Sequence, residues 1–508
     1  MSSSDEIWIV PFFGQGHLLP SIELCKQIAS RNFKTTLLIP SDLYSTIPSS
    51  LHQHPLVEVV LLPSSPHPPP PPPSPPLHGG HHQEASPTPT IGQALENYLL
   101  SSRARQPPAC AVVDVMMGRM GPQLFNKHGI PTIAFFTSGA CSAAMEYAMW
   151  KLHLRTPEED VKPGEIRLVP GLPHGMAITD SDFKTRPPNH PPPPPAHHQN
   201  TGPHNMMGPP PPPPPRPGSR PPWLEEFGGS IAYMMNTCDD LERPFIQYLA
   251  DQIGKPVWGV GPLLPQEYYW KDGSSLIQDH QVRANRGSNV TEDQVIAWLD
   301  SKPRGSVLYV SFGTEVGPEE EEYANLADAL EASSDLPFIW VVQSHSGRRP
   351  GPPPSSPHDD IDDDDDEGYF PKGLDEKVGG ERGLIIHGWA PQLLILSHPS
   401  LGGFLSHCGW NSAVEAIGRG VPFLAWPIRG DQFHNAKLIV KHLRLGCIIS
   451  QDLSRPVTKH DIITGIERLM GDEDLRTRAA LLGNTFGQGF PATSANSLDA
   501  FADFIRQA

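Results

Sequence analysis

The sequence lacks the usual features of membrane-bound and secreted proteins. It has no apolar run approaching the ~20 residues that span a bilayer. Its first residues, MSSSDEIWIV, contain neither the basic segment nor the long apolar core of a signal peptide. Only six cysteines occur in 508 residues, none in a Cys-x-x-Cys pair, which is typical of free thiols in a reducing compartment. We therefore expect a cytoplasmic protein without a membrane span.

Positive charge is also scarce. The chain has 38 lysines and arginines against 56 acidic residues, and its formal net charge is −18. Eight of the negative charges fall in one run, residues 359–367, but the remaining chain still carries −10. Because nucleic-acid binding requires a basic surface, we exclude a nucleic-acid partner.

Three segments of biased composition stand apart from the rest of the chain. Residues 64–90 and 187–222 are rich in proline, and residues 343–368 pass from proline and serine into a run of aspartates. Such segments bury too little apolar surface to fold, so we expect surface loops whose histidines are solvated rather than metal-bound. Proline tracts also fit partner domains that bind polyproline, which keeps a scaffold role open as an alternative.

Elsewhere the sequence alternates between strand and helix patterns. Apolar stretches at Ile7–Phe13 and Thr35–Pro40 flank a glycine turn and an amphipathic segment, residues 19–30. This strand–helix–strand order predicts a parallel sheet. Further strands are expected at Val57–Leu62, Ala111–Val115 and Thr132–Phe136.

A second series of the same kind begins at Ser306–Gly313 and continues with a helix, Glu319–Ala332, and a strand, Phe338–Val342. Two series predict an α/β protein with two facing, Rossmann-like, doubly wound domains that bind ligands at the C-terminal ends of their strands. We expect the domains at residues 1–252 and 253–488, joined through the Pro/Gly-rich Gly254–Pro265. A helix in residues 489–508 is expected to pack back on the first domain.

One stretch of 44 residues, Trp389–Gln432, combines glycines, a His-Cys-Gly-Trp-Asn-Ser run, one glutamate and a terminal Asp-Gln pair. Core packing does not explain this mixture, so it indicates a ligand site. Within the stretch we expect a strand at Gly402–Ser406, a turn at residues 407–411 and a helix at Ser412–Arg419. A helix N-terminus offers free N–H groups and a partial positive charge, which suit a diphosphate.

Individual side chains in this stretch suit different parts of a nucleotide sugar. His407, Asn411 and Ser412 can each add a hydrogen bond to a phosphate. Glu415 can accept two hydrogen bonds from ribose hydroxyls, although Ser412 and Glu415 also fit a capping box in which the glutamate only closes the helix start. Trp389, at the end of an expected strand, Gly383–His387, can stack on a base, although a lone tryptophan is more often a core residue.

The stretch resembles, from end to end, the donor-sugar signature box of plant family-1 UDP-dependent glycosyltransferases. Residues 236–242, 258–263, 295–300 and 311–314 are similar to other segments of that family. The resemblance implies a GT-B fold whose N-terminal domain binds the acceptor and whose C-terminal domain binds the UDP-sugar. It also implies a UDP-sugar co-substrate, favouring UDP-glucose because the box ends in Gln432, and no metal or other cofactor.

The resemblance further implies which residues touch the donor. They would be Trp389, Ala390 and Gln392 at the uracil, Glu415 at the ribose, His407, Asn411, Ser412 and Thr314 at the diphosphate, and Thr137, Trp410, Asp431 and Gln432 at the sugar. The last three also combine an apolar face with hydrogen-bonding groups, which suits a hexose, although Asp431 and Gln432 fit ordinary loop polarity as well.

Two residues of the first half are candidates for catalysis. His17 follows Gly14 and Gly16 after the first strand, but the third glycine of a dinucleotide fingerprint is missing, which argues against an oxidoreductase. An imidazole, with an ordinary pKa of ~6.5, can take a proton from a hydroxyl near neutral pH. Asp114 places a charge at the end of an apolar strand and can orient that imidazole. The family has an aspartate at the matching position; the alternative for His17 is a polar helix-start residue.

We therefore expect an inverting glycosyltransferase, acting as a monomer, that moves glucose to a hydroxyl of a small lipophilic plant metabolite. A flavonoid or another phenolic is favoured, with terpenoids, hormones and C-glycosylation left open. Its pocket is expected in the N-terminal domain, including loops near residues 64–90, 140–155 and 187–222. Five residues of that domain suggest an adaptable apolar surface, although helix packing explains them equally well: Met116, Met117, Met145, Met149 and Trp150. The alternative is a catalytically weak UDP-sugar-binding scaffold that uses its proline-rich loops, against which His17 and Asp114 argue.

Overall fold

The computed structural model describes residues 6–12, 14–63, 90–101, 107–118, 120–152, 161–183, 217–269, 287–314, 316–342, 374–487 and 489–507. The expectations for the three biased segments fall outside these residues, apart from Thr90 and residues 217–222. Among the described residues, no helix is both long and apolar enough to cross a membrane.

The first half of the chain forms a seven-stranded parallel sheet in the order β3-β2-β1-β4-β5-β8-β9. Its strands are β1 (Glu6–Val10), β2 (Lys34–Pro40), β3 (Val57–Leu62), β4 (Cys110–Asp114), β5 (Thr132–Phe136), β8 (Ala232–Met235) and β9 (Val257–Gly259). The helices of this half are α1 (Gln15–Ala29), α2 (Ser49–His52), α3 (Ile91–Leu100), α4 (Met120–Lys127), α5 (Ala140–Lys151), α6 (Pro222–Glu226) and α7 (Asp239–Ile253). A small antiparallel pair, β6 (Ile166–Arg167) and β7 (Ile178–Thr179), lies apart from the sheet.

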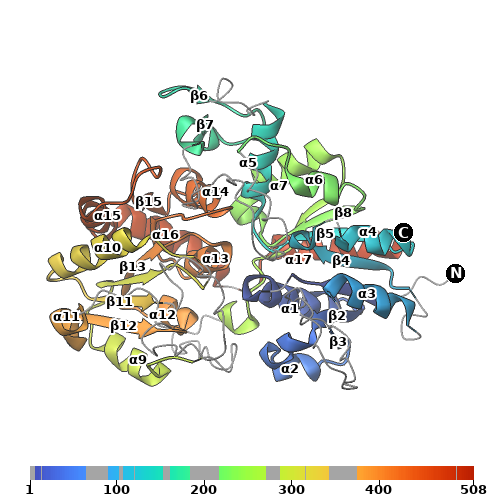
Figure 1. The fold of residues 1–508 in the computed structure, drawn as a ribbon, viewed down its shortest axis with the longest axis horizontal. Helices are drawn as coiled ribbons and strands as arrows, with labels where there is room; N and C mark the ends of the chain where they lie inside the picture. Colours follow the sequence, from blue (N-terminus) through green and yellow to red (C-terminus); the bar gives the residue numbers. More distant parts are fainter. Residues whose placement is uncertain are drawn as a thin grey trace, which may run out of the picture.

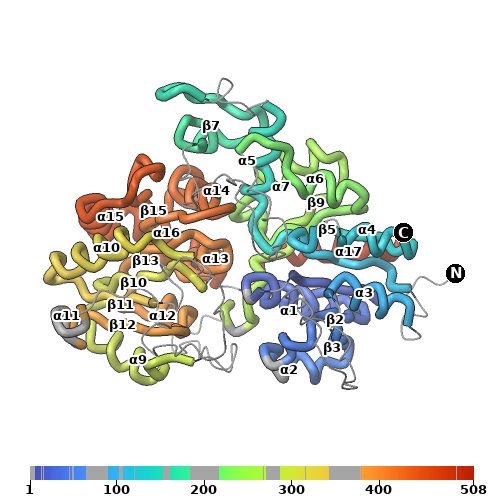
Figure 2. Tube along the Cα trace, viewed as in Figure 1, coloured from blue at the N-terminus to red at the C-terminus, as the bar shows by residue number. Residues whose placement is uncertain are grey.

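The second half forms a six-stranded parallel sheet in the order β12-β11-β10-β13-β14-β15. Its strands are β10 (Val307–Ser311), β11 (Phe338–Val342), β12 (Gly383–His387), β13 (Leu401–Ser406), β14 (Phe423–Ala425) and β15 (Gly446–Ile448). Its helices are α9 (Glu292–Asp300), α10 (Glu320–Ala332), α11 (Leu374–Arg382), α12 (Gln392–Ser397), α13 (Trp410–Gly418), α14 (Gln432–Lys437), α15 (Lys459–Gly471) and α16 (Glu473–Phe486). Figures 1 and 2 show the two units as separate lobes side by side. The expected fold class, two doubly wound α/β units, is therefore confirmed.

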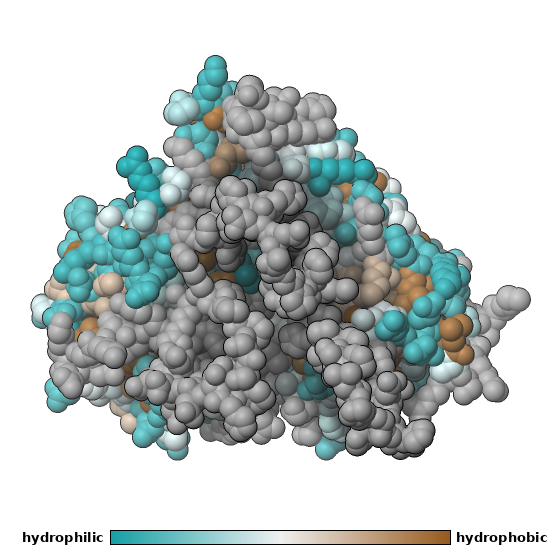
Figure 3. All heavy atoms as spheres, viewed as in Figure 1, coloured by the Kyte–Doolittle hydropathy of each residue, from teal (hydrophilic) through white to brown (hydrophobic). Residues whose placement is uncertain are grey.

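Alternation along each strand places apolar side chains on both faces of each sheet, as a doubly wound fold requires. In β1, Ile7 and Ile9 join a core beneath α1, whereas Trp8 and Val10 face a second core that continues into the other lobe. A third core lies on the outer face of the second sheet, under α10 and α15. The described surface over those two helices is mainly hydrophilic on the face shown in Figure 3.

The boundary between the halves differs from the expected one. Strand β9 follows residue 252, yet it pairs with β8 as the edge of the first sheet. The Pro/Gly-rich join at Gly254–Pro265 thus contains the last strand of the first unit. We propose that the N-terminal domain extends through Gly259 and that the second domain begins after this join.

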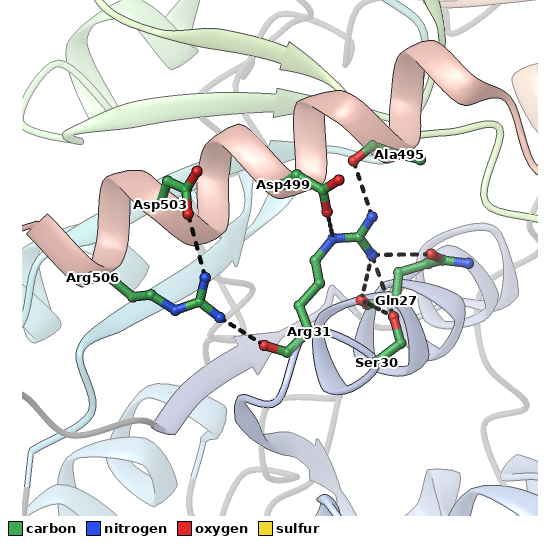
Figure 4. Close-up of polar contacts among 7 residues, drawn as sticks. All are labelled: Gln27, Ser30, Arg31, Ala495, Asp499, Asp503 and Arg506. Atoms are coloured by element: carbon green, nitrogen blue, oxygen red, sulfur yellow. Dashed lines mark hydrogen bonds and ion pairs between the residues drawn. The ribbon is translucent and has the colours of Figure 1, made fainter.

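The last helix, α17 (Ala492–Gln507), returns to the first unit (Figure 1). Phe501 is fully buried between the rings of Phe33 and Trp258, with centroids 6.4 and 5.8 Å away. Arg31, just after α1, donates from Nε to Asp499 Oδ1 at 2.8 Å and from Nη2 to the Ala495 carbonyl at 3.0 Å (Figure 4). The C-terminus therefore clamps the helix that carries His17.

This clamp predicts a stability effect. Replacing Phe501→Ala should lower the free energy of unfolding by about 3–5 kcal/mol, because it removes a large aromatic side chain from a packed core. On the same helix, Asp503→Ala should change it little, because its ion pair with Arg506 is mostly exposed. Urea unfolding followed by tryptophan fluorescence measures both. Equal effects of the two substitutions would contradict the packing role of α17.

Candidate active site

Both sheets reverse their strand order once, and these two points hold the site. In the first sheet the reversal lies between β1 and β4, and in the second between β10 and β13. A crevice opens where neighbouring connections leave on opposite faces of a parallel sheet, and ligands bind there. A cavity of about 620 Å³ lies between the two units at these strand ends.

The cavity brings together nearly all of the residues that we expected to contact ligands. His17 lines it, and so do all twelve expected donor-binding residues: Thr137, Thr314, Trp389, Ala390, Gln392, His407, Trp410, Asn411, Ser412, Glu415, Asp431 and Gln432. Asp114 is absent from the wall because it is fully buried behind His17. We propose the ligand role of each of these residues.

His17 sits in the first turn of α1, directly after β1. The chain turns from strand to helix at Gly14, whose φ and ψ of 148° suit glycine almost alone. His17 Nδ1 lies 2.8 Å from Asp114 Oδ2 and 2.9 Å from Thr137 Oγ1. A carboxylate can only accept hydrogen bonds, so Nδ1 carries the proton and Nε2 keeps its lone pair. The geometry is that of a histidine base with a supporting aspartate.

Backbone groups hold Asp114 in place. Its Oδ1 accepts from the Met116 N–H at 2.9 Å and its Oδ2 from the Phe12 N–H at 3.3 Å. Each of these N–H groups gives a buried carboxylate oxygen a hydrogen-bond partner. The carboxylate thus has partners on each oxygen before His17 is counted.

On the opposite wall, β13 runs into α13 through a turn at His407–Gly409. The α13 N-cap, Gly409, supplies no side-chain cap, so the first N–H groups of the helix are open to the cavity. Glycines at 313 and 409 leave room for the His407 ring: a Cβ on either would lie within 2.8 Å of its Nε2. Burial lowers the pKa of His407 to about 4, so the ring is neutral at physiological pH. Its Nδ1 has no well-aligned hydrogen-bond partner among the described residues.

The capping-box alternative for Glu415 is wrong. Helix α13 begins at Trp410, two residues earlier than expected, which moves Glu415 out of the capping position. Glu415 Oε2 instead accepts from Gln392 Nε2 at 2.7 Å, and the same nitrogen donates to Ser412 Oγ at 3.1 Å. The Tyr309 hydroxyl donates to Gln392 Oε1 at 3.1 Å. Gln392, expected at the uracil edge, therefore also positions the residues expected at ribose and phosphate.

Two hydrogen bonds join the facing walls. Asn411 Nδ2 donates to the Gly16 carbonyl at 3.0 Å, and Trp410 Nε1 donates to the Asn236 carbonyl at 2.7 Å. The first bond depends on Pro20 within α1: proline has no N–H, so the Gly16 carbonyl, four residues earlier, is left without its helical partner. Trp410 therefore has an interdomain role that the sequence did not predict.

The expected sugar end lies at the start of α14. Gln432 Oε1 accepts from the backbone N–H groups of Ile428 and Arg429, which closes the preceding loop and orients the side chain at the cavity wall. Asp431 accepts from Asn435 Nδ2 at 3.0 Å, and burial raises the pKa of Asp431 above its ordinary value. Thr137 faces this region from the end of β5 in the other unit.

Sequence reasoning missed part of the wall. Ser142, Glu146, Trp223 and Glu226 line the cavity from the first unit, and Arg429 from the second. Arg429 lies inside the signature stretch and was detectable there; the others lie in segments without a motif. Of the five residues expected in an apolar acceptor pocket, only Met116 lines the cavity, whereas Met117, Met145 and Met149 are buried in the core and Trp150 packs against it.

Known proteins match both the sequence and this geometry. A family model described as UDP-glucoronosyl and UDP-glucosyl transferase matches residues 288–485. UDP-glycosyltransferase 73B4 of Arabidopsis thaliana is 27% identical over 505 residues, covering 94% of this chain and 93% of the relative. These matches support the assignment of the chain to the plant family-1 UDP-glycosyltransferases. UDP-glycosyltransferase 92A1 of the same plant is 28% identical over 532 residues, covering 98% of this chain and 96% of the relative.

A solved structure supports the same placement. Phytolacca americana UGT2, complexed with UDP-2fluoro-glucose and pterostilbene, aligns with this transferase at a TM-score of 0.66 and 25% identity. The alignment covers 98% of this chain and 99% of the other. This chain is thus a UDP-glycosyltransferase, which moves a sugar from a UDP-sugar to a small plant metabolite.

The buried His407 predicts a pH effect on the stability of this transferase. Its pKa is about 4 in the folded protein against an ordinary 6.5, so the unfolded chain binds the proton more tightly and acidification favours unfolding. Between pH 7 and pH 5 the free energy of unfolding should fall by about 2 kcal/mol through this one group. His407→Gln should lose less stability over that interval than the wild type, and the exposed His460→Gln should behave like the wild type. Calorimetric melting temperatures at both pH values test this.

Proposed function

We propose that this transferase is an inverting glucosyltransferase that acts on a hydroxyl of a flat phenolic compound such as a flavonoid. The observation that carries the proposal is the 2.8 Å contact between His17 Nδ1 and the buried Asp114, with His17 at the wall of the cavity that the donor residues share. We further propose that the transferase acts as a monomer, since both walls of the cavity come from one chain. We also propose that it acts in the cytoplasm.

In the proposed reaction, His17 Nε2 takes the proton of the acceptor hydroxyl. The oxygen attacks the anomeric carbon of the sugar as the bond to UDP breaks, and the electron pair leaves with the β-phosphate. Asp114 stabilises the imidazolium that forms. One displacement inverts the anomeric carbon, so an α-linked UDP-sugar gives a β-glycoside.

The charge that develops on UDP meets groups that are already in position. The open N–H groups at the start of α13 and its positive dipole end stabilise an oxyanion, and Asn411 and Ser412 can donate beside them. Arg429 is the only lysine or arginine among the described residues of the cavity wall. It can balance part of the diphosphate charge.

The choice of glucose and of a phenolic acceptor rests on two supports. The stretch ends in Gln432, whose amide nitrogen suits a sugar hydroxyl, and the Phytolacca americana relative is complexed with a fluoro-glucose donor and with pterostilbene, a phenolic stilbene. In this chain Val115, Met116, Phe136 and Trp223 make the first-unit side of the cavity largely apolar. A flat aromatic acceptor fits such a wall.

The catalytic proposal predicts the behaviour of two variants. His17→Ala should lower kcat with UDP-glucose and a flavonol by about 10²–10⁴-fold, because the general base is lost. Asp114→Asn should also lower kcat, because the amide can donate to Nδ1 and favour the wrong tautomer. UDP release and product mass measure turnover. Full turnover by His17→Ala would rule out the mechanism.

The donor site predicts a separate effect on binding. Glu415→Ala should weaken UDP binding by about 10–100-fold, because it removes a charged acceptor for the ribose hydroxyls and releases Gln392. Glu467→Ala, an exposed residue of α15, serves as the control and should bind UDP like the wild type. Isothermal titration with UDP alone compares them. Unchanged UDP affinity in Glu415→Ala would contradict the proposed contact between Glu415 and the ribose.

A further inference from the structure

The first-unit wall of the cavity carries two carboxyl groups that the proposed chemistry does not use. Glu146 belongs to α5 and Glu226 ends α6, and both line the cavity together with Phe136 and Trp223. Acidic side chains in a largely apolar wall need polar partners, because removing a charge from water is costly. Both belong to the first unit, which is expected to bind the acceptor, so the acceptor is the ligand that they would meet.

Glu146 is held in a defined orientation. Its Oε2 accepts from Trp223 Nε1 at 3.1 Å, and its Oε1 lies 3.5 Å from Ser142 Oγ, one turn earlier on the same face of α5. Ser142 Oγ is in turn 3.1 Å from His434 Nδ1 of α14. Glu146 is only partly buried, and it lines the cavity. A carboxyl fixed by an indole and a hydroxyl, with surface left toward the cavity, is built to receive a hydrogen-bond donor.

The charges around Glu146 determine what that donor can be. No lysine or arginine lines the cavity from the described part of the first unit. In the second unit Asp431 contributes to raising the pKa of Glu146, to about 7, after the larger effect of burial. A carboxylate acceptor would therefore approach the Glu146 carboxyl with no lysine or arginine among the described first-unit residues of the wall to balance its charge.

We propose that Glu146 is a specificity-determining residue that selects neutral acceptors with a second hydroxyl remote from the reacting one and rejects carboxylic acids. The inference rests on the proposed function, since it places a phenolic acceptor between His17 and α5. One hydroxyl of the acceptor faces His17 while another donates to Glu146. The two contacts together orient a flat molecule in a largely apolar pocket.

Three acceptors that share one skeleton test the proposal: 4-hydroxybiphenyl, 4,4′-dihydroxybiphenyl and 4′-hydroxybiphenyl-4-carboxylic acid. The measured quantity is kcat/KM with UDP-glucose for the wild type and for Glu146→Gln, expressed for each enzyme as a ratio to its own value with 4-hydroxybiphenyl. In the wild type we expect kcat/KM with 4,4′-dihydroxybiphenyl, the diol, to exceed that with 4-hydroxybiphenyl by about tenfold or more. For the carboxylic acid we expect kcat/KM to be lower than that with 4-hydroxybiphenyl by at least the same factor. In Glu146→Gln the diol ratio should shrink and the acid ratio should rise, each by about tenfold.

Glu225→Gln is the matched control, because Glu225 is the neighbour of Glu226 on α6 but is exposed and does not line the cavity. Its ratios should equal those of the wild type, and melting temperatures of both variants verify folding. Binding of the diol to the wild type and to Glu146→Gln in the presence of UDP gives a second readout that does not depend on turnover. Unchanged ratios in Glu146→Gln would overturn the inference while leaving the proposed function intact. If the wild type glycosylates none of the three compounds, the phenolic assignment and the inference both fail.

Discussion

The site exists only while the C-terminal strand ends of two parallel sheets face each other, and a few polar contacts across the cleft fix that arrangement. Trp410 reaches the Asn236 carbonyl and Asn411 reaches the Gly16 carbonyl. Farther along, Lys437 at the end of α14 pairs with Asp182 at 2.7 Å, and both side chains are nearly buried. A buried ion pair is sensitive to geometry, because either charge left alone in a low-dielectric setting is costly. Opening the cleft therefore exposes unmatched charge as well as apolar surface.

These contacts tie the interdomain geometry to the proposed chemistry. Asn411 and Trp410 are the first residues of the helix whose N-terminus would hold the diphosphate, and Gly16 precedes His17. Whatever positions α13 relative to α1 therefore also positions the leaving group relative to the base. Helix α17 also connects the two units, because the chain leaves the second unit and packs against the first. Phe501 of this helix contacts Phe33, and Asp499 accepts a hydrogen bond from Arg31. The distance between His17 and the start of α13 therefore depends on the packing of the whole fold and not on the signature stretch alone.

Sequence reasoning succeeded where the signal is local. The strands at residues 57–62, 132–136, 338–342 and 383–387 occur where the apolar runs predicted them, because buried parallel strands are short and continuous. Helix α1 begins at Gln15, ahead of the expected amphipathic segment at residues 19–30, and it contains Pro20 in its interior.

In the site, the residue types of the signature stretch predicted residues that line one cavity, but not the hydrogen bonds between them. Gln392 lies 20 residues before Ser412 and 23 before Glu415 along the chain. Only the packing of α12 against α13 brings these side chains together. The acceptor wall was largely missed for a related reason. Glu146 and Met145 are neighbours on α5, yet one faces the cavity and the other the core. Composition alone does not give the rotation of a helix.

The polar groups of the cavity have a common energetic character. Burial raises the pKa of Glu146 and Asp431 and lowers that of His407, so each of these groups is held in an environment that disfavours its charged form. Such groups reduce the stability of the empty protein, because they have lost water without gaining a full set of partners. A ligand that supplies hydroxyls and phosphate oxygens offsets that cost, so part of its binding free energy comes from relieving the strain of the empty site. Shifted pKa values that cluster in one cleft are typical of functional sites for this reason, and here they lie on both walls, as expected of an enzyme that must hold two different substrates at once.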